Sequence, residues 1–150
     1  MFVRLGSKKI QILRSSDAYF LVASILKRRQ AIDIEKEFFI CIGLKTSNFI
    51  KYVDIVSIGT LNGTVACGRE IFKSAILRSA AAIILSHNHP SGNKEPSLAD
   101  IELTRKMVEI GKYLDIRVVD HVIVTTDCGY YSFSDEGLIE YDEKFEKYKT

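Results

Sequence analysis

The stretch AAAIILSHNHPSGNKEPSLAD, residues 80–100, holds two of the three histidines of this 150-residue chain. Its apolar first part, followed by Pro90 and Gly92, predicts a buried central strand at 82–86 that ends in a turn. In an extended chain, side chains two residues apart point to the same face, so His87 and His89 can reach one ion together. The spacing therefore indicates a metal site at the end of a strand.

A helix is expected to follow, beginning near Ser97 or Leu98, because apolar residues recur at spacings of four and three. These residues are Leu103, Met107, Ile110 and Leu114. Asp100 lies three residues before Leu103 and extends this stripe toward the start of the helix, so we expect its carboxylate to face inward. A buried carboxylate is costly unless it is paired, hydrogen-bonded or bound to a metal. Asp100 is therefore a third candidate ligand.

Ser97 and Asp100 also have a second interpretation. A serine followed three residues later by an acidic residue, before an apolar run, is typical of a helix-capping box, with Asp100 in place of the usual Glu or Gln. Capping gives no reason for a His-x-His pair at the end of a buried strand, whereas a metal site does. Imidazole nitrogens suit zinc, at about 2.0–2.1 Å. We therefore expect His87, His89 and Asp100 to bind a metal ion.

The rest of the chain mixes predicted helices with predicted strands, which indicates an α/β layered domain. Helices are expected at 17–29, around 72–79 and from 97 or 98 to 114, and strands at 37–44, 49–59, 82–86, 117–126 and 129–133. Residues 135–150 are polar and are expected to form a terminal helix or a frayed tail. We find no internal repeat and no linker, so residues 1–150 are expected to form a single domain.

Composition bounds the classes of protein that remain. The chain is 47% apolar and 27% charged, and its 21 basic and 19 acidic residues leave a net charge of +2, so no overall field attracts it to nucleic acid or to anionic lipid. The longest apolar segment, 80–85, is too short to span a membrane, and the N-terminus lacks the apolar region of a signal peptide. Cys41, Cys67 and Cys128 form no CxxC motif and fit a reducing compartment. We expect a cytoplasmic protein whose cysteines pack as small apolar groups.

The pattern His87-x-His89-x7-Ser97-x2-Asp100 resembles the metal signature of the JAB/MPN metalloproteases, the JAMM motif. The segments GTLNGT, REIFKSAI, AAAIILSHNHPSG, ADIELTRK, DHVIV and GYYSF are similar to the RadC family of bacterial JAB-domain proteins. This resemblance covers residues 38–137. It implies a three-layer α-β-α JAB/MPN fold, of the cytidine deaminase-like kind, with a central mixed sheet. Within it, 1–30 would be an N-terminal extension with a helix, 31–137 the JAB core and 138–150 a C-terminal tail.

The resemblance also implies roles for particular residues. By this resemblance, the two histidines and the aspartate would bind zinc, a water molecule would fill the fourth position, and Ser97 would hydrogen-bond this water or the developing oxyanion. A glutamate at the start of an early strand takes the proton from the water and passes it to the leaving amine. Glu37 matches this position best, and Glu35 and Glu70 are the alternatives. The implied function is a zinc metallopeptidase or isopeptidase that acts on a peptide or isopeptide substrate.

Two other functions stay open. One is a metal-dependent nuclease, although residues 87–89 match the HNH nuclease motif only in spelling. The other is a non-catalytic, DNA-repair-associated metal-binding module with a nucleic-acid partner. Longer RadC proteins carry a helix-hairpin-helix-like region, whereas 36 residues precede Glu37 here, so a nucleic-acid partner is the weaker expectation. His121 has no partner at ligand spacing and is expected to be a hydrogen-bonded structural residue.

Overall fold

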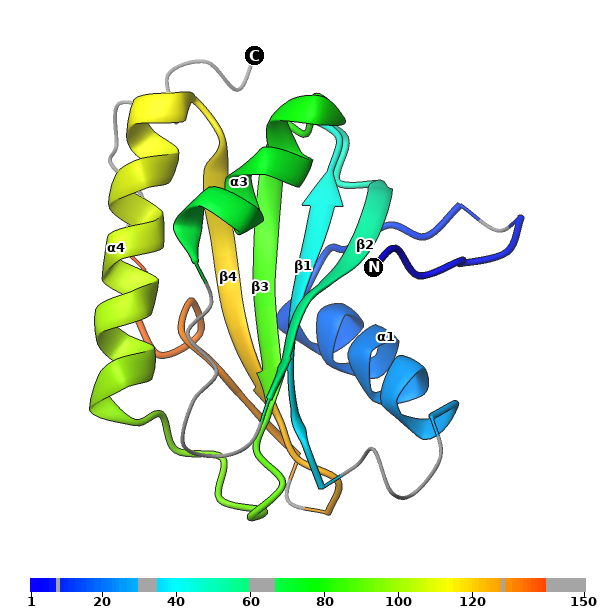
Figure 1. Ribbon diagram of the computed structural model, residues 1–150, viewed down its shortest axis with the longest axis vertical. Coiled ribbons are helices and arrows are strands. Elements are labelled where there is room, and N and C mark those ends of the chain that lie inside the picture. The colour runs from blue at the N-terminus through cyan, green and yellow to red at the C-terminus, as the bar shows by residue number, and fades with distance from the viewer. Residues whose placement is uncertain (8, 30–34, 60–66, 128, 140–150) are drawn as a thin grey trace.

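A computed structural model describes residues 1–7, 9–29, 35–59, 67–127 and 129–139 (Figure 1). The strands form one mixed sheet in the order β2-β1-β3-β4-β5. They are β1 (Glu37–Leu44), β2 (Ile50–Gly59), β3 (Ala82–Asn88), β4 (Arg117–Val124) and β5 (Tyr130–Ser132), and the helices of the described ranges are α1 (Ser15–Lys27), α3 (Gly68–Leu77) and α4 (Leu98–Leu114). Strands β3 and β4 are parallel and α4 connects them, whereas the other neighbouring strands are antiparallel.

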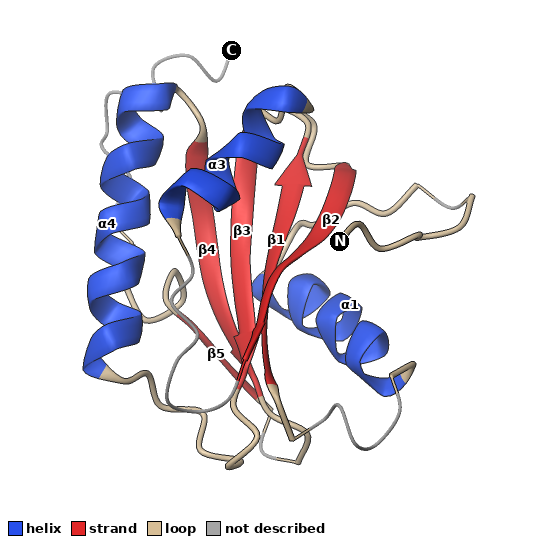
Figure 2. Ribbon diagram, in the orientation of Figure 1, coloured by secondary structure: helices blue, strands red, loops and turns tan. Residues whose placement is uncertain are grey.

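Helices cover both faces of the sheet (Figure 2), with α1 on one face and α3 and α4 on the other. Alternate residues of β1 supply the two cores. Phe38 and Ile40 pack in the cluster that contains α1, whereas Phe39 and Cys41 pack in the cluster that contains α3 and Met107 of α4. Strands buried on both faces have nearly continuous apolar sequences, as 37–44 does. The predicted three-layer α-β-α arrangement with a mixed sheet is confirmed.

Most helices and strands begin and end within two residues of their predicted positions. Strand β1 begins and ends at the predicted residues. Helix α1 begins at Ser15 rather than Asp17, because the Asp17 carboxylate accepts hydrogen bonds from the backbone N–H groups of Leu13 and Arg14 at 2.9 and 3.0 Å. Helix α3 begins four residues before Phe72, the first residue of the predicted apolar pattern. Residues 60–64 of the GTLNGT segment and residues 140–150 of the predicted tail lie outside the described residues.

The buried face of α4 differs from the predicted stripe. Leu114 is 40% exposed, and the buried residues of the helix are Thr104, Met107 and Gly111. These follow Asp100 at spacings of four, three and four, so they continue a stripe that begins at the predicted ligand. The prediction that Leu114 lies in the core was wrong. The prediction followed large apolar residues only, and two of the three buried residues, Thr104 and Gly111, are not of that kind.

Gly111 allows α4 to lie close to the start of β4. A Cβ atom at this position would lie 2.4 Å from the backbone oxygen of Ile116. Alanine raises helix propensity by about 1 kcal/mol, whereas overpacking costs typically about 1–3 kcal/mol. The nearest atom here belongs to the backbone, so we expect Gly111→Ala to lower the free energy of unfolding by about 1–2 kcal/mol. Urea unfolding of the two proteins measures this change, and a stabilised variant would contradict the close approach.

Cysteine packing follows the prediction only in part. Cys41 is buried, and burial raises the pKa of its thiol to about 12. Cys67 is exposed, contrary to the prediction, because it occupies the N-cap position of α3 at the surface. Cys128 lies outside the described residues. Within the described ranges, we find no helix that is long and apolar enough to cross a membrane.

Candidate metal centre

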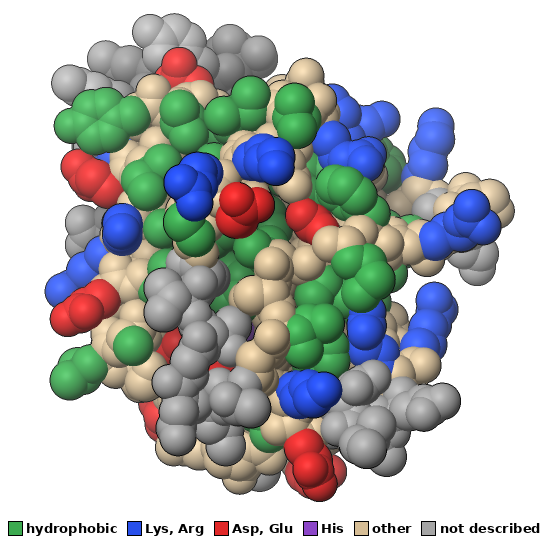
Figure 3. Space-filling view, in the orientation of Figure 1, with side chains coloured by type: hydrophobic (Ala, Val, Ile, Leu, Met, Phe, Trp, Pro, Cys, Tyr) green, Lys and Arg blue, Asp and Glu red, His purple; other side chains and the backbone are tan. Residues whose placement is uncertain are grey.

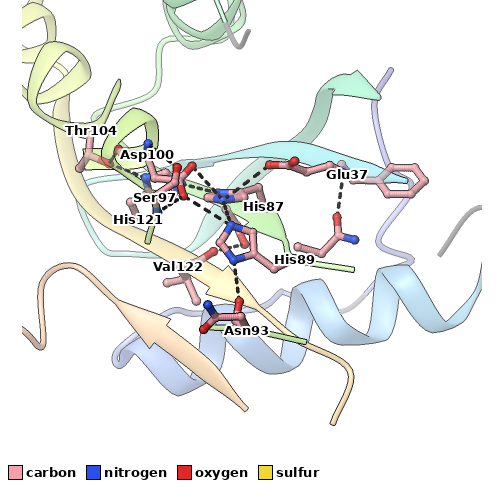
Figure 4. A network of polar contacts seen from close by, with 12 residues as sticks. Glu37, His87, His89, Asn93, Ser97, Asp100, Thr104, His121 and Val122 are labelled. Carbon is pink, nitrogen blue, oxygen red and sulfur yellow. Dashed lines mark hydrogen bonds and ion pairs between the residues drawn. The ribbon is translucent and has the colours of Figure 1, made fainter. Parts of the chain in front are cut away.

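The end of β3 and the start of β1 bring distant residues together. Phe39 pairs with His87, so Glu37, two residues earlier on β1, has its side chain on the same face of the sheet as His87. After β3 the chain turns and returns as α4, whose N-cap is Ser97 and whose first turn contains Asp100. Figure 4 shows these side chains converging from β1, β3 and α4.

Four side chains form a compact group of possible metal ligands. Glu37, His87, His89 and Asp100 each offer one atom, and these atoms all lie within 4.8 Å of one another. His87 Nε2 is 3.2 Å from Asp100 Oδ1 and 3.7 Å from Glu37 Oε1, and His89 Nε2 is 3.4 Å from Asp100 Oδ2. The two histidine Nε2 atoms are 2.9 Å apart. Two imidazoles and two carboxylates in this arrangement could hold a metal ion.

The group is fully buried at His87 and partly exposed at its other members. The His87 side chain is 1% exposed, whereas Asp100, His89 and Glu37 are 13%, 15% and 20% exposed. Burial would raise the pKa of Asp100, but its hydrogen bonds with His87 and His89 hold this pKa well below its ordinary value. The hydrogen bond with Asp100 raises the pKa of His89 against the effect of burial. The Asp100 carboxylate is therefore ionised and favours a cation beside it.

Asp100 belongs to the helix cap and to the metal group at once. Its Oδ2 accepts a hydrogen bond from the Ser97 backbone N–H at 2.7 Å, and Ser97 Oγ accepts one from the Asp100 N–H at 3.1 Å. This is the capping box that the sequence offered as the alternative to a metal ligand. The same carboxylate faces both histidines, so the two interpretations are compatible.

Asn88 holds the backbone on both sides of Glu37, a contact that the sequence did not predict. Its buried side chain accepts a hydrogen bond from the Phe38 N–H at 2.7 Å and donates one to the Lys36 carbonyl oxygen at 2.9 Å. The Asn88 side chain thereby continues the contact between β1 and β3 beyond the backbone pairing and holds Glu37 beside the histidines. The available signal was an amide at the end of a buried strand, because a buried amide needs partners.

His121 is buried and hydrogen-bonded, as expected. Its Nε2 lies 2.8 Å from His87 Nδ1 and its Nδ1 lies 2.6 Å from Thr104 Oγ1. Burial lowers the pKa of His121 well below its ordinary value. His121 is not a member of the four-residue group, but it contacts one member directly. Neither this contact nor the hydrogen bond of Thr104 with His121 was predicted from the sequence.

The other two glutamate candidates lie outside the group. Glu35 is exposed and precedes β1. Glu70 is exposed in the first turn of α3, where its Oε1 lies 3.8 Å from Arg69 Nε. Of the three glutamates considered from the sequence, Glu37 is the one whose carboxylate lies beside His87.

A mixed sheet between layers of helices, with His-x-His at the end of a central strand and a Ser/Asp pair at the start of the next helix, defines a domain of the JAB/MPN class. The chain matches the model of the RadC-like JAB domain over residues 13–138, and it belongs to this family. The resemblance noted from the sequence is thereby confirmed.

Relatives from archaea and bacteria agree with this assignment. The chain is similar to the UPF0758 proteins of Methanosarcina acetivorans (43% identity over 131 residues, 87% of this chain and 55% of the relative) and Methanococcoides burtonii (44% over 131 residues, 87% and 55%). It is also similar to the UPF0758 protein of Moorella thermoacetica (50% over 106 residues, 71% and 46%). The chain spans about half the length of the curated relatives it matches.

Proposed function

We propose that this chain is a zinc-dependent hydrolase that cleaves a peptide or isopeptide bond. The observation that carries the proposal is the convergence of His87, His89 and Asp100 on one point, with the Glu37 carboxylate beside them. Catalytic zinc sites typically have three protein ligands and keep a fourth position for water or substrate. Three of these residues can serve as ligands, which leaves Glu37 for proton transfer.

The donor atoms fit zinc. His89 Nδ1 lies 2.7 Å from the Asn93 carbonyl oxygen, and because a carbonyl oxygen only accepts, Nδ1 carries the proton. When His89 is neutral, its Nε2 therefore has the lone pair that a metal ion needs. Two imidazole nitrogens and a carboxylate oxygen suit zinc better than magnesium or calcium, which prefer oxygen ligands.

In the proposed reaction, a water oxygen attacks the carbonyl carbon and the bond from this carbon to nitrogen breaks. Bound zinc would supply Lewis acidity, which polarises a carbonyl and lowers the pKa of water toward neutrality. Glu37 accepts the proton that the water loses and transfers it to the leaving nitrogen. Ser97 Oγ accepts from the Asp100 N–H, so its own proton can be donated to the oxygen on which negative charge develops.

Mixed libraries of peptides and lysine-linked isopeptides test this proposal. Cleavage is followed by mass spectrometry of new termini with zinc-loaded protein, chelator-treated protein and chelator-treated protein to which zinc is returned. We expect cleavage to need zinc and to return with it. A chain that holds one zinc ion and cleaves neither kind of bond would contradict the proposal.

Zinc affinity is expected to fall as the pH falls from 8 to 6. His89 must lose its proton to bind through Nε2, and the hydrogen bond with Asp100 raises its pKa above the ordinary value of 6.5. Below this raised pKa a proton competes with zinc, which weakens binding by up to about tenfold per pH unit for each proton. Calorimetric titration at pH 6, 7 and 8 measures the change. Equal affinity at pH 6 and pH 8 would exclude His89 as a ligand.

A non-catalytic metal-binding module that accompanies nucleic acid is the second candidate. The four-residue group favours this second candidate in one respect. If Glu37 were a fourth zinc ligand, no position would be left for a catalytic water, as in structural zinc sites. In the space-filling view, Lys and Arg side chains gather on the side of β2 and the N-terminal segment (Figure 3). Such a surface could contact phosphates.

DNA retention at increasing salt concentration separates the two candidates. The module predicts salt-dependent retention that survives His87→Ala, together with no cleavage of either library. A hydrolase predicts cleavage that His87→Ala abolishes, whether or not the chain binds DNA.

A further inference from the structure

A chain of hydrogen bonds connects two of the proposed ligands through residues outside the metal group (Figure 4). It runs from His87 Nδ1 to His121 Nε2 at 2.8 Å, and from His121 Nδ1 to Thr104 Oγ1 at 2.6 Å. Thr104 Oγ1 then donates to the backbone oxygen of Asp100, also at 2.6 Å. The contacts join the ring of a β3 residue to the main chain of α4 by way of β4.

The direction of each hydrogen bond can be assigned by starting from the backbone oxygen of Asp100. A carbonyl oxygen only accepts, so the single hydroxyl proton of Thr104 is used there. Thr104 Oγ1 must then accept from His121, which places a proton on His121 Nδ1. A neutral His121 accepts at Nε2, so His87 Nδ1 carries a proton and donates. In a neutral His87, Nε2 then has the lone pair, and this atom faces Asp100 and His89.

The surroundings of His121 require it to be neutral. Its ring is fully buried, stacked on Phe133 at 4.9 Å and in edge contact with Phe39 at 5.7 Å. Its two nitrogens face a hydroxyl and another imidazole rather than a carboxylate. A charged imidazolium without an acidic partner is strongly disfavoured in such a place.

We propose that Thr104 and His121 are positioning residues that fix the tautomer and the orientation of His87, so that Nε2 is its metal-binding atom. This inference rests on the proposed metal site. Outer partners of this kind orient metal-binding histidines in general, and their loss typically weakens metal binding about 10–100-fold. Here the outer partner is the neutral His121. Thr104 connects it by hydrogen bonds to the backbone of Asp100, a second proposed ligand.

Metal affinity of a matched pair of variants tests the inference without any substrate. Thr104→Val keeps the shape of the side chain and removes the hydroxyl, whereas Thr104→Ser keeps the hydroxyl. We expect Thr104→Val and His121→Phe to bind Zn²⁺ and Co²⁺ about tenfold or more weakly, and Thr104→Ser to bind within about threefold of wild type. Circular dichroism and urea unfolding establish that each variant is folded.

Imidazole nitrogen NMR of the zinc-loaded wild-type chain gives a second test that needs no variant. Both His121 and His87 are expected as the tautomer with the proton on Nδ1. A proton on His121 Nε2, or unchanged zinc affinity in folded Thr104→Val, would overturn the inference and leave the proposed hydrolase intact. A wild-type chain that binds no zinc would overturn both.

Discussion

Replacing Glu37 by Gln is expected to reduce the rate of bond cleavage by about 10³-fold while zinc remains bound, since general acid–base catalysis contributes roughly 10²–10⁴-fold. Glutamine has nearly the same shape as glutamate, and the backbone on both sides of residue 37 is still held by Asn88. The amide cannot take a proton from water and return it to the leaving nitrogen. Rate measurement and elemental analysis on the same preparations check both halves of this expectation.

Glu35→Gln and Glu70→Gln are the matched controls, because both glutamates are exposed and lie outside the metal group. We expect both controls to retain wild-type rates. Undiminished activity of Glu37→Gln would exclude Glu37 as the base. Loss of zinc from this variant would instead identify Glu37 as a ligand and favour the closed, structural site.

Asp100→Asn is expected to weaken zinc binding by about 100-fold or more, since it changes a ligand and even the loss of an outer partner costs about 10–100-fold. The substitution removes the charge that faces His87 and His89 but leaves an oxygen that can accept from the Ser97 N–H. Asp100→Ala removes both functions. The pair of variants therefore separates the metal ligand from the helix cap.

Zinc titration and urea unfolding of the metal-free proteins measure the two effects of changing Asp100. Both variants should lose zinc affinity. Without metal, Asp100→Asn should be more stable than Asp100→Ala by about 1 kcal/mol, the usual contribution of a cap. Zinc affinity of Asp100→Asn within a few-fold of wild type would show that the carboxylate is not a ligand.

The local part of the site could be predicted from sequence because its residues lie close together along the chain. His87, His89, Ser97 and Asp100 fall within 14 consecutive positions, where strand alternation and helix spacing determine which side chains share a face. The cap, which the structure shows, and the proposed ligand role of Asp100 do not exclude each other. A carboxylate has two oxygens and can accept several hydrogen bonds, so it can serve both roles.

The proximity of Glu37 could not be derived in this way. Its strand was predicted with the observed limits, but the pairing of β1 with β3 joins residues that are 38 to 48 positions apart, and only the resemblance to a family pointed to Glu37. Asn88 was missed for the same reason, since its partners are peptide groups of Lys36 and Phe38.

Thr104 and Gly111 show the limit of hydrophobic periodicity on α4. Thr104 is buried because it hydrogen-bonds His121 and the Asp100 backbone, and Gly111 is buried because α4 lies close to Ile116. Neither reason involves apolar surface. A prediction based on apolar residues alone therefore included Leu114 in the buried stripe and left out Thr104 and Gly111.

Anomalous diffraction at the zinc edge, from crystals of the zinc-loaded chain, tests the open three-ligand site most directly. We expect one zinc ion at about 2.0–2.2 Å from His87 Nε2, His89 Nε2 and an Asp100 carboxylate oxygen, with Glu37 outside the coordination sphere. A zinc ion that binds Glu37 as a fourth protein ligand, or that lies away from His87 and His89, would contradict this site.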